Sequence, residues 1–224
     1  MDDTRNQHQI IRKDARNCFV ESLSDAFAFG KVHLGFATYD TKLPAGQRQT
    51  TSVHIYIAAD EFLELCRKLF SGEMRHLVAQ RKKSGDKAPL YKCLGGTSAE
   101  KLAKLGRTRP DGMSLSRTAE LHCGKNADFL FVANSGPGET NKAGLIVPRF
   151  GGDPENHVAV SMAWDTFAGF MLTTKAHYEA WLAAWYAKQD GAAKPKTQPK
   201  REVAPAPQEP EYSAGPEYES MPMF

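Results

Sequence analysis

Two ten-residue stretches decide the expected fold: VHIYIAADEF at residues 53–62 and VAVSMAWDTF at residues 158–167, which align without a gap. Each begins with apolar residues at every second position, the period of a half-buried strand. Each then reaches an aspartate, Asp60 or Asp165, that is a good N-cap for a following helix. The match predicts a duplicated unit in which antiparallel strands run into a capped helix.

The same two periodicities extend along the chain and predict an α+β fold with curved antiparallel sheets. Residues 31–39 and 50–57 read as a hairpin, and 58–83 as a helical region that Gly72 interrupts. Glycine-rich segments at 95–96 and 134–138 read as loops. Further strands are expected at 90–94, 115–122, 128–133, 144–150 and 157–162, with a last helix at 165–188.

An aromatic stripe on the last expected helix, Tyr178, Trp181 and Trp185, predicts a face buried on the sheet or at a subunit interface. A membrane-surface helix would carry more lysine and arginine on its polar face.

Composition divides the chain of 224 residues into three expected parts. Residues 1–16 are polar and read as a flexible arm, and residues 17–188 read as one folded domain. Residues 189–224 are poor in aliphatic side chains and predict a disordered tail. The tail has four basic and six acidic residues, a net charge of −2. The whole chain carries +3, so the body carries +5, which suits an anionic ligand.

Several function classes lack support in the sequence. No apolar run is long enough for a membrane span and no secretory signal is recognisable, so we expect a cytoplasmic protein. Phosphate-loop, zinc-protease and nucleophile-elbow motifs are missing, so we expect neither an enzyme nor a cofactor or metal. A zinc site at Cys93, Cys123 and His122 is a minor alternative, because these ligands lack the usual close spacing.

One face of the first two strands interleaves cations with aromatic rings, a pattern suited to pairing phosphates and stacking bases. Loops and later strands add further cations. The predicted nucleic-acid-binding residues are Lys31, His33, Tyr39, Lys42, Arg48, His54, Tyr56, Tyr91, Lys92, Arg107, Arg109, Arg117 and Arg149. An ordinary solvated sheet face is the alternative interpretation.

The chain ends in glutamates followed by Met221, Pro222, Met223 and Phe224. This end resembles the C-terminal tail of bacterial single-stranded DNA-binding proteins, which finishes in acidic residues and an apolar peptide with proline and a terminal phenylalanine. The resemblance implies that these four residues dock replication, recombination and repair proteins. The glutamates are spaced more thinly than in that family.

The body does not look like the oligonucleotide-binding barrel of those proteins. Repeated strands followed by a helix look more like the Whirly fold and its relatives, found in phages and mobile elements. That resemblance implies single-strand binding on a sheet surface and assembly into a homo-oligomer.

We therefore expect a single-stranded DNA-binding protein with little sequence preference that recruits partners through its tail. An RNA-binding module, a protein–protein adaptor and, more remotely, an enzyme remain alternatives, because the DNA–RNA distinction depends on contacts to the 2′-hydroxyl.

Overall fold

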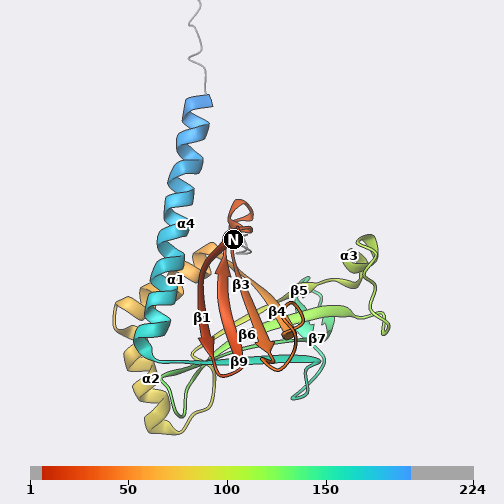
Figure 1. The fold of residues 1–224 in the computed structure, drawn as a ribbon, viewed down its shortest axis with the longest axis horizontal. Coiled ribbons are helices and arrows are strands. Elements are labelled where there is room, and N and C mark those ends of the chain that lie inside the picture. Colours follow the sequence, from red (N-terminus) through yellow and green to blue (C-terminus); the bar gives the residue numbers. More distant parts are fainter. Residues whose placement is uncertain (1–6, 193–224) are drawn as a thin grey trace, which may run out of the picture.

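The computed structural model describes residues 7–192 as an α+β fold with two curved antiparallel sheets (Figure 1). The expected tail begins at residue 189, but residues 189–192 belong to a helix; residues 193–224, with the docking peptide Met221, Pro222, Met223 and Phe224, lie outside the described residues. The first sheet is a meander in chain order, formed by β1 (Gln9–Ala15), β2 (Cys18–Leu23), β3 (Lys31–Tyr39) and β4 (Gln49–Ala58).

The second sheet is built around its longest strand, β7 (Phe129–Thr140). β6 pairs along one side of β7, while β8 and β9 share the other side. β8 pairs with residues 138–140 and β9 with residues 129–135. The remaining strands are β5 (Tyr91–Thr97), β6 (Ser114–Cys123), β8 (Ile146–Pro148) and β9 (Asn156–Met162).

Helices follow both sheets. β4 runs directly into α1 (Ala59–Phe70), and β9 runs into α4 (Trp164–Ala192), as the two matching stretches predict. The remaining helical elements are η1 (Phe27–Phe29), α2 (Glu73–Ser84) and α3 (Ala99–Lys104). Gly72, at φ 86°, separates α1 from α2 at the predicted break.

The predicted aspartate caps are wrong in detail, because both helices begin before these residues. Ala58 is the N-cap of α1, and Asp60 lies in the first turn, where a carboxylate still favours the helix dipole. Asp165 also lies in the first turn of its helix. The cap of α4 comes from the β6–β7 loop, where Asp128 Oδ2 accepts the Trp164 N–H at 2.7 Å.

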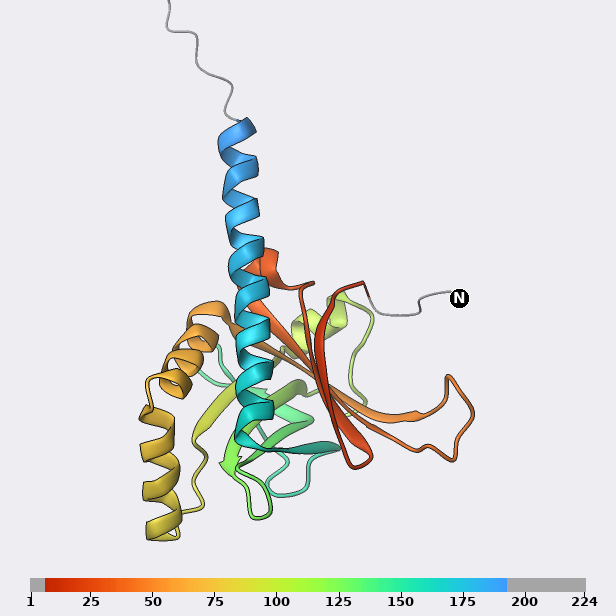
Figure 2. The ribbon, with the colours of Figure 1, turned by 60° about the vertical axis from the view of Figure 1, so that its left-hand side comes forward.

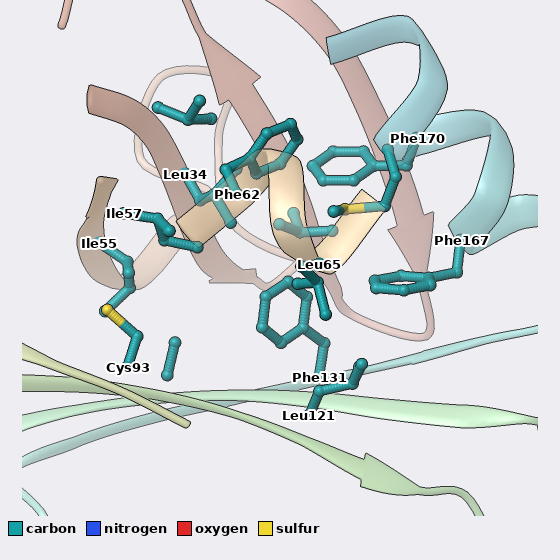
Figure 3. Packing of buried hydrophobic residues seen from close by; sticks show 14 of the residues in the cluster. Leu34, Ile55, Ile57, Phe62, Leu65, Cys93, Leu121, Phe131, Phe167 and Phe170 are labelled. Atoms are coloured by element: carbon teal, nitrogen blue, oxygen red, sulfur yellow. The ribbon is translucent and has the colours of Figure 1, made fainter. Parts of the chain in front are cut away.

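The core joins both sheets to α1 and to the first turns of α4. Figure 3 shows Leu34, Phe62, Phe131, Phe167 and Phe170 converging from these four elements. The ring of Phe131 lies 5.0 Å from that of Phe36 across the two sheets, edge to face. Each fully buried side chain of this size contributes about 1.5–3 kcal/mol, so this cluster fixes the sheets relative to each other.

The expected flexible arm is a strand over residues 9–15. It pairs with β2 through a tight turn in which Asn17 adopts φ 59°. Asparagine tolerates this left-handed conformation better than most residues. Ile10 and Ile11 pack against the core, so β1 is tied to the sheet.

Both glycine-rich segments expected to be loops are strand interiors. Gly95 and Gly96 lie in β5, and Gly136 to Gly138 lie in β7. A Cβ on Gly96 would lie 2.2 Å from the Leu115 carbonyl oxygen, and one on Gly138 would lie 2.7 Å from Ser116 Cβ. Glycine is needed here because neighbouring strands approach too closely for a side chain.

Candidate nucleic-acid interface

A cleft of about 680 Å³ opens between the two sheets. β3 and β4 supply one wall and β5 and β6 the other. The remaining lining comes from η1, α3 and the segment leading into β8. Figure 1 shows α3 at the opposite end of the molecule from α4.

Three cations line this cleft: Lys31 from β3, Lys101 from α3 and Arg117 from β6. None of them is ion-paired with a carboxylate of residues 7–192. The Arg117 guanidinium donates a hydrogen bond to the Thr97 hydroxyl, from Nη1 at 3.0 Å. Burial lowers the pKa of Arg117, because a charge removed from water loses its hydration. A partly buried cation that lacks a counter-charge is a strong attractor for an anionic ligand.

A chain of hydrogen bonds runs from His54 in the cleft lining to His33 and Asp25 behind it. His33 is only 4% exposed, with Nδ1 2.8 Å from Asp25 and Nε2 2.9 Å from His54 Nδ1. If Asp25 accepts the proton of His33 Nδ1, then His33 Nε2 accepts from His54. His54 Nε2 is then left as an acceptor. Burial lowers the pKa of His54, and the charges of His33 and Arg117 lower it further.

Tyr56 supplies the aromatic surface of the cleft. Its ring stacks on the buried His33 ring with centroids 4.3 Å apart and an angle of 19° between the planes. Its side chain remains 43% exposed. A ring fixed on one side and open on the other is pre-ordered for a flat ligand, and one stacked base contributes about 1–3 kcal/mol.

Apolar residues complete the rim. Phe29, Leu94 and Leu145 are 79%, 41% and 56% exposed, and all three line the cleft. Exposed apolar side chains gathered beside unpaired cations suit a ligand with both flat apolar and anionic parts. A nucleotide has this combination.

The structure gathers four of the predicted binding residues in the cleft lining: Lys31, His54, Tyr56 and Arg117. His33 lies behind them, because β3 is buried on both faces from Val32 to Ala37 and not on one face as its pattern suggested.

Three further predicted residues lie at the far end of the β3–β4 hairpin. Tyr39 lies at the end of β3, and its hydroxyl donates to the Ala15 carbonyl at 3.4 Å. Lys42 and Arg48 lie in the exposed connection between β3 and β4, where Arg48 Nε donates to the Leu43 carbonyl. Lys42 and Arg48 make no ion pair within the described residues, and none of the three lines the cleft.

The other predicted residues of the second sheet are occupied by nearby acids. Lys92 pairs with Glu120 at 2.7 Å, and Arg149 pairs with Glu139. Tyr91 lies 3.4 Å from Glu61, and burial is the main cause that raises its pKa.

Arg109 and Arg107 lie on the segment between α3 and β6. Arg109 is held between Asp111 at 2.7 Å and Glu155 at 2.5 Å. Arg107 is exposed and lies outside the cleft lining.

Sequence reasoning missed Lys101, Phe29, Leu94 and Leu145. For Lys101 the usable signal was Ser98, which marks the start of the helix that carries Lys101. The Ser98 hydroxyl caps α3 by accepting the Lys101 N–H at 3.3 Å. Serine before a short stretch of helix formers is a recognisable helix start. The three apolar residues carried no local signal, since their exposure depends on the tertiary arrangement.

The zinc alternative finds no supporting geometry. His122 Nε2 lies 3.0 Å from Glu120 Oε2, and residues 7–192 contain no group of three His, Cys, Asp or Glu side chains that could hold a metal ion. No helix in the same range is long and apolar enough to cross a bilayer.

In a comparison with known proteins, no protein-family model, curated protein or solved structure matches the chain.

Proposed function

We propose that this protein binds single-stranded DNA with little sequence preference and holds part of the strand in the cleft between its sheets. The observation that carries the proposal is the set of three cleft cations that have no acidic partner among residues 7–192, beside an open, pre-stacked Tyr56 ring. Phosphates would pair with Lys31, Lys101 and Arg117, and a base would stack on Tyr56.

The cleft favours a single strand over a duplex for a physical reason. A base must leave its own stack to place its face on Tyr56, and an unpaired strand does this at low cost. Stacking and phosphate pairing read no base edges, so little sequence preference follows. The apolar rim of Phe29, Leu94 and Leu145 would cover the remaining edges of the base.

We further propose that the body is a Whirly-like duplication. Its support is the order of elements, in which β1, β2, β3 and β4 precede α1, while β5, β6, β7 and β9 precede α4. The body would present the strand, and the C-terminal residues Met221, Pro222, Met223 and Phe224 would recruit replication, recombination or repair proteins.

Fluorescence anisotropy tests the binding proposal with labelled single-stranded DNA, duplex DNA and RNA over a salt series. Single strands should bind best. If the three cleft cations neutralise three phosphates, log K should fall against log salt with a slope of about −2. Removal of residues 221–224 should leave binding intact while abolishing recruitment. Absence of single-strand binding at low salt, or equal binding of duplex, would contradict the proposal, and tighter binding of RNA would favour an RNA-binding module.

A further inference from the structure

One histidine of the cleft has a ring nitrogen that is open to a ligand. His54 lines the cleft, and its Nδ1 lies 2.9 Å from Nε2 of His33. The other ring nitrogen of His33, Nδ1, lies 2.8 Å from a carboxylate oxygen of Asp25. Both histidines belong to the β3–β4 hairpin, whose tip extends away from α4 (Figure 2), and Asp25 precedes η1. Because the three residues lie on separate segments of the chain, no catalytic sequence motif contains them.

These hydrogen bonds fix the tautomer of His54. A carboxylate only accepts hydrogen bonds, so the proton of a neutral His33 ring lies on Nδ1, and its Nε2 accepts from His54 Nδ1. A neutral His54 ring then has an unprotonated Nε2. This nitrogen has no hydrogen-bond partner among residues 7–192. The bond to His33 also holds the His54 ring in one orientation, which is how a third group orients a catalytic base.

Cations lie beside this base. Burial, and then the charges of His33 and Arg117, lower the pKa of His54, so the ring is in its neutral, proton-accepting form at pH 7. Lys31 lines the same cleft, and neither Arg117 nor Lys31 is ion-paired within residues 7–192. If these cations hold phosphates, a step that rests on the proposed function, then His54 lies next to a phosphodiester. Cations in this position also stabilise the negative charge that develops on a phosphate as it reacts.

We propose that the cleft cleaves single-stranded RNA by transesterification, with His54 as the general base. His54 Nε2 takes the proton of a ribose 2′-hydroxyl as that oxygen attacks the adjacent phosphorus, and a bond from O2′ to phosphorus forms. The bond from phosphorus to O5′ of the next nucleotide breaks, and O5′ takes a proton from water. His54 then returns its proton to water. The products are a 2′,3′-cyclic phosphate and a free 5′-hydroxyl, and no further co-reactant is consumed.

The 2′-hydroxyl decides which strands react. It distinguishes RNA from DNA, and it is the only nucleophile in this reaction. DNA would therefore bind in the same cleft and leave it uncut, so the activity adds to single-strand DNA binding without replacing it.

A DNA oligonucleotide that contains one ribonucleotide tests the activity. The full chain, at concentrations that saturate the oligonucleotide in an anisotropy titration, should cut it at the ribonucleotide alone, and mass spectrometry should find the cyclic phosphate. The all-DNA strand and a strand with a 2′-O-methyl group at that position should stay intact. Cutting of either control would overturn the proposal. Binding without cutting would overturn it and leave the proposed function standing, whereas absence of binding by every strand would overturn both.

His54→Gln tests the base. At saturating protein its cutting rate should fall by about a hundredfold or more, the usual contribution of a general base. His157→Gln is the matched control, because His157 is an exposed histidine outside the cleft lining whose Nδ1 is also hydrogen-bonded, to Asn134 Oδ1 at 2.7 Å. It should cut at the wild-type rate, and circular dichroism confirms that both variants are folded. Equal rates for H54Q and the wild-type protein would overturn the role of His54.

Asp25 is a positioning residue, because it acts only through the two histidines. Asp25→Asn keeps an oxygen that can accept from His33 Nδ1 but removes the negative charge, which raises the pKa of His54 in the wild-type protein. The increase of the cutting rate with pH should therefore move to lower pH in this variant. The other titratable or charged groups near His54 or in the same lining are His33, Arg117, Lys31, Tyr56, Cys93 and Lys101. A pH profile that does not move would overturn this role of Asp25.

Discussion

Cations in two regions of the second sheet meet different electrostatic conditions. In the cleft, Arg117 of β6 donates only to the neutral Thr97 hydroxyl and forms no ion pair within the described residues. Outside the cleft, Arg149 follows β8 and donates to Glu139 from both Nε and Nη2. Both are arginines of one sheet region, yet only Arg117 keeps its charge uncompensated.

The difference shows that the count of cations in a sequence does not measure a binding surface. The two charges of a surface ion pair nearly cancel when seen from a ligand. Breaking such a pair in order to bind a phosphate therefore adds little to the binding free energy. An unpaired and partly buried cation has lost hydration without gaining a counter-ion, so an arriving phosphate recovers that loss. We therefore propose the cleft, and not the acid-paired surface, as the place where a nucleic acid would bind.

The largest expected effect comes from breaking the cleft wall itself. Gly96→Ala would place a Cβ 2.2 Å from the Leu115 carbonyl oxygen at a residue whose φ is 149°. Backbone of β5 or β6 must shift, and we expect a loss of about 3 kcal/mol or more in the free energy of unfolding. Chemical denaturation measures this loss.

Gly95→Ala is the matched control on the adjacent residue. Its Cβ would meet only the Arg117 carbonyl oxygen, at an ordinary 3.8 Å. A free energy of unfolding within about 1 kcal/mol of wild type is expected. Equal destabilisation by both substitutions would show that β5 does not need the close approach at Gly96.

The second prediction compares the two arginines directly. Arg117→Met should weaken single-strand binding by about ten- to hundredfold, since a buried charge-assisted contact to phosphate is lost. Arg149→Met should change it by less than about twofold, because Glu139 already neutralises that side chain. Fluorescence anisotropy at one low salt concentration measures both variants. If the two losses are similar, the distinction between free and paired cations is wrong.

The sequence predicted the strand-to-helix junctions well because their signals are local. The change from period two to a helical period at residues 58–62 and 162–167 is visible without any knowledge of the partner strands. The strands expected at 90–94 and 128–133 are present, but their extension through Gly95, Gly96 and Gly138 was not predicted, because glycine reads as a turn signal unless the close neighbour is known. β1 was missed because its polar composition conceals Ile10 and Ile11.

The residues of the cleft were predicted only in part, again because part of the information is not local in the sequence. Residue type identified Lys31, His54, Tyr56 and Arg117 but did not exclude Arg109. A local clue against Arg109 is Asp111, which follows it by two residues and pairs with it at 2.7 Å. Arg109 is neutralised by Glu155, 46 residues away in the chain. Pairings over that separation are set by the tertiary fold, so the list of candidate cations was longer than the set the cleft uses.

The smallest expected effect concerns pH and refines the electrostatics of the cleft. His54 lies in the cleft lining near Arg117 and is hydrogen-bonded to His33, which in turn is hydrogen-bonded to Asp25. Because burial, His33 and Arg117 lower the pKa of His54 below its ordinary value of 6.5, the ring is neutral at pH 7. A bound phosphate favours the protonated ring, so binding should tighten as pH falls through that lowered pKa, by about three- to tenfold.

A fall in pH should have the opposite effect on the stability of the free protein. The folded state binds its His54 proton less readily than the unfolded chain, so the free energy of unfolding decreases as pH falls below about 6.5. Titrations must therefore stay where thermal denaturation shows a folded protein. His54→Gln keeps a polar side chain without a titrating ring, and its binding should lack the extra tightening at low pH. An unchanged pH profile in that variant would assign the effect to another group and would leave Lys31, Lys101 and Arg117 as the whole charge of the cleft.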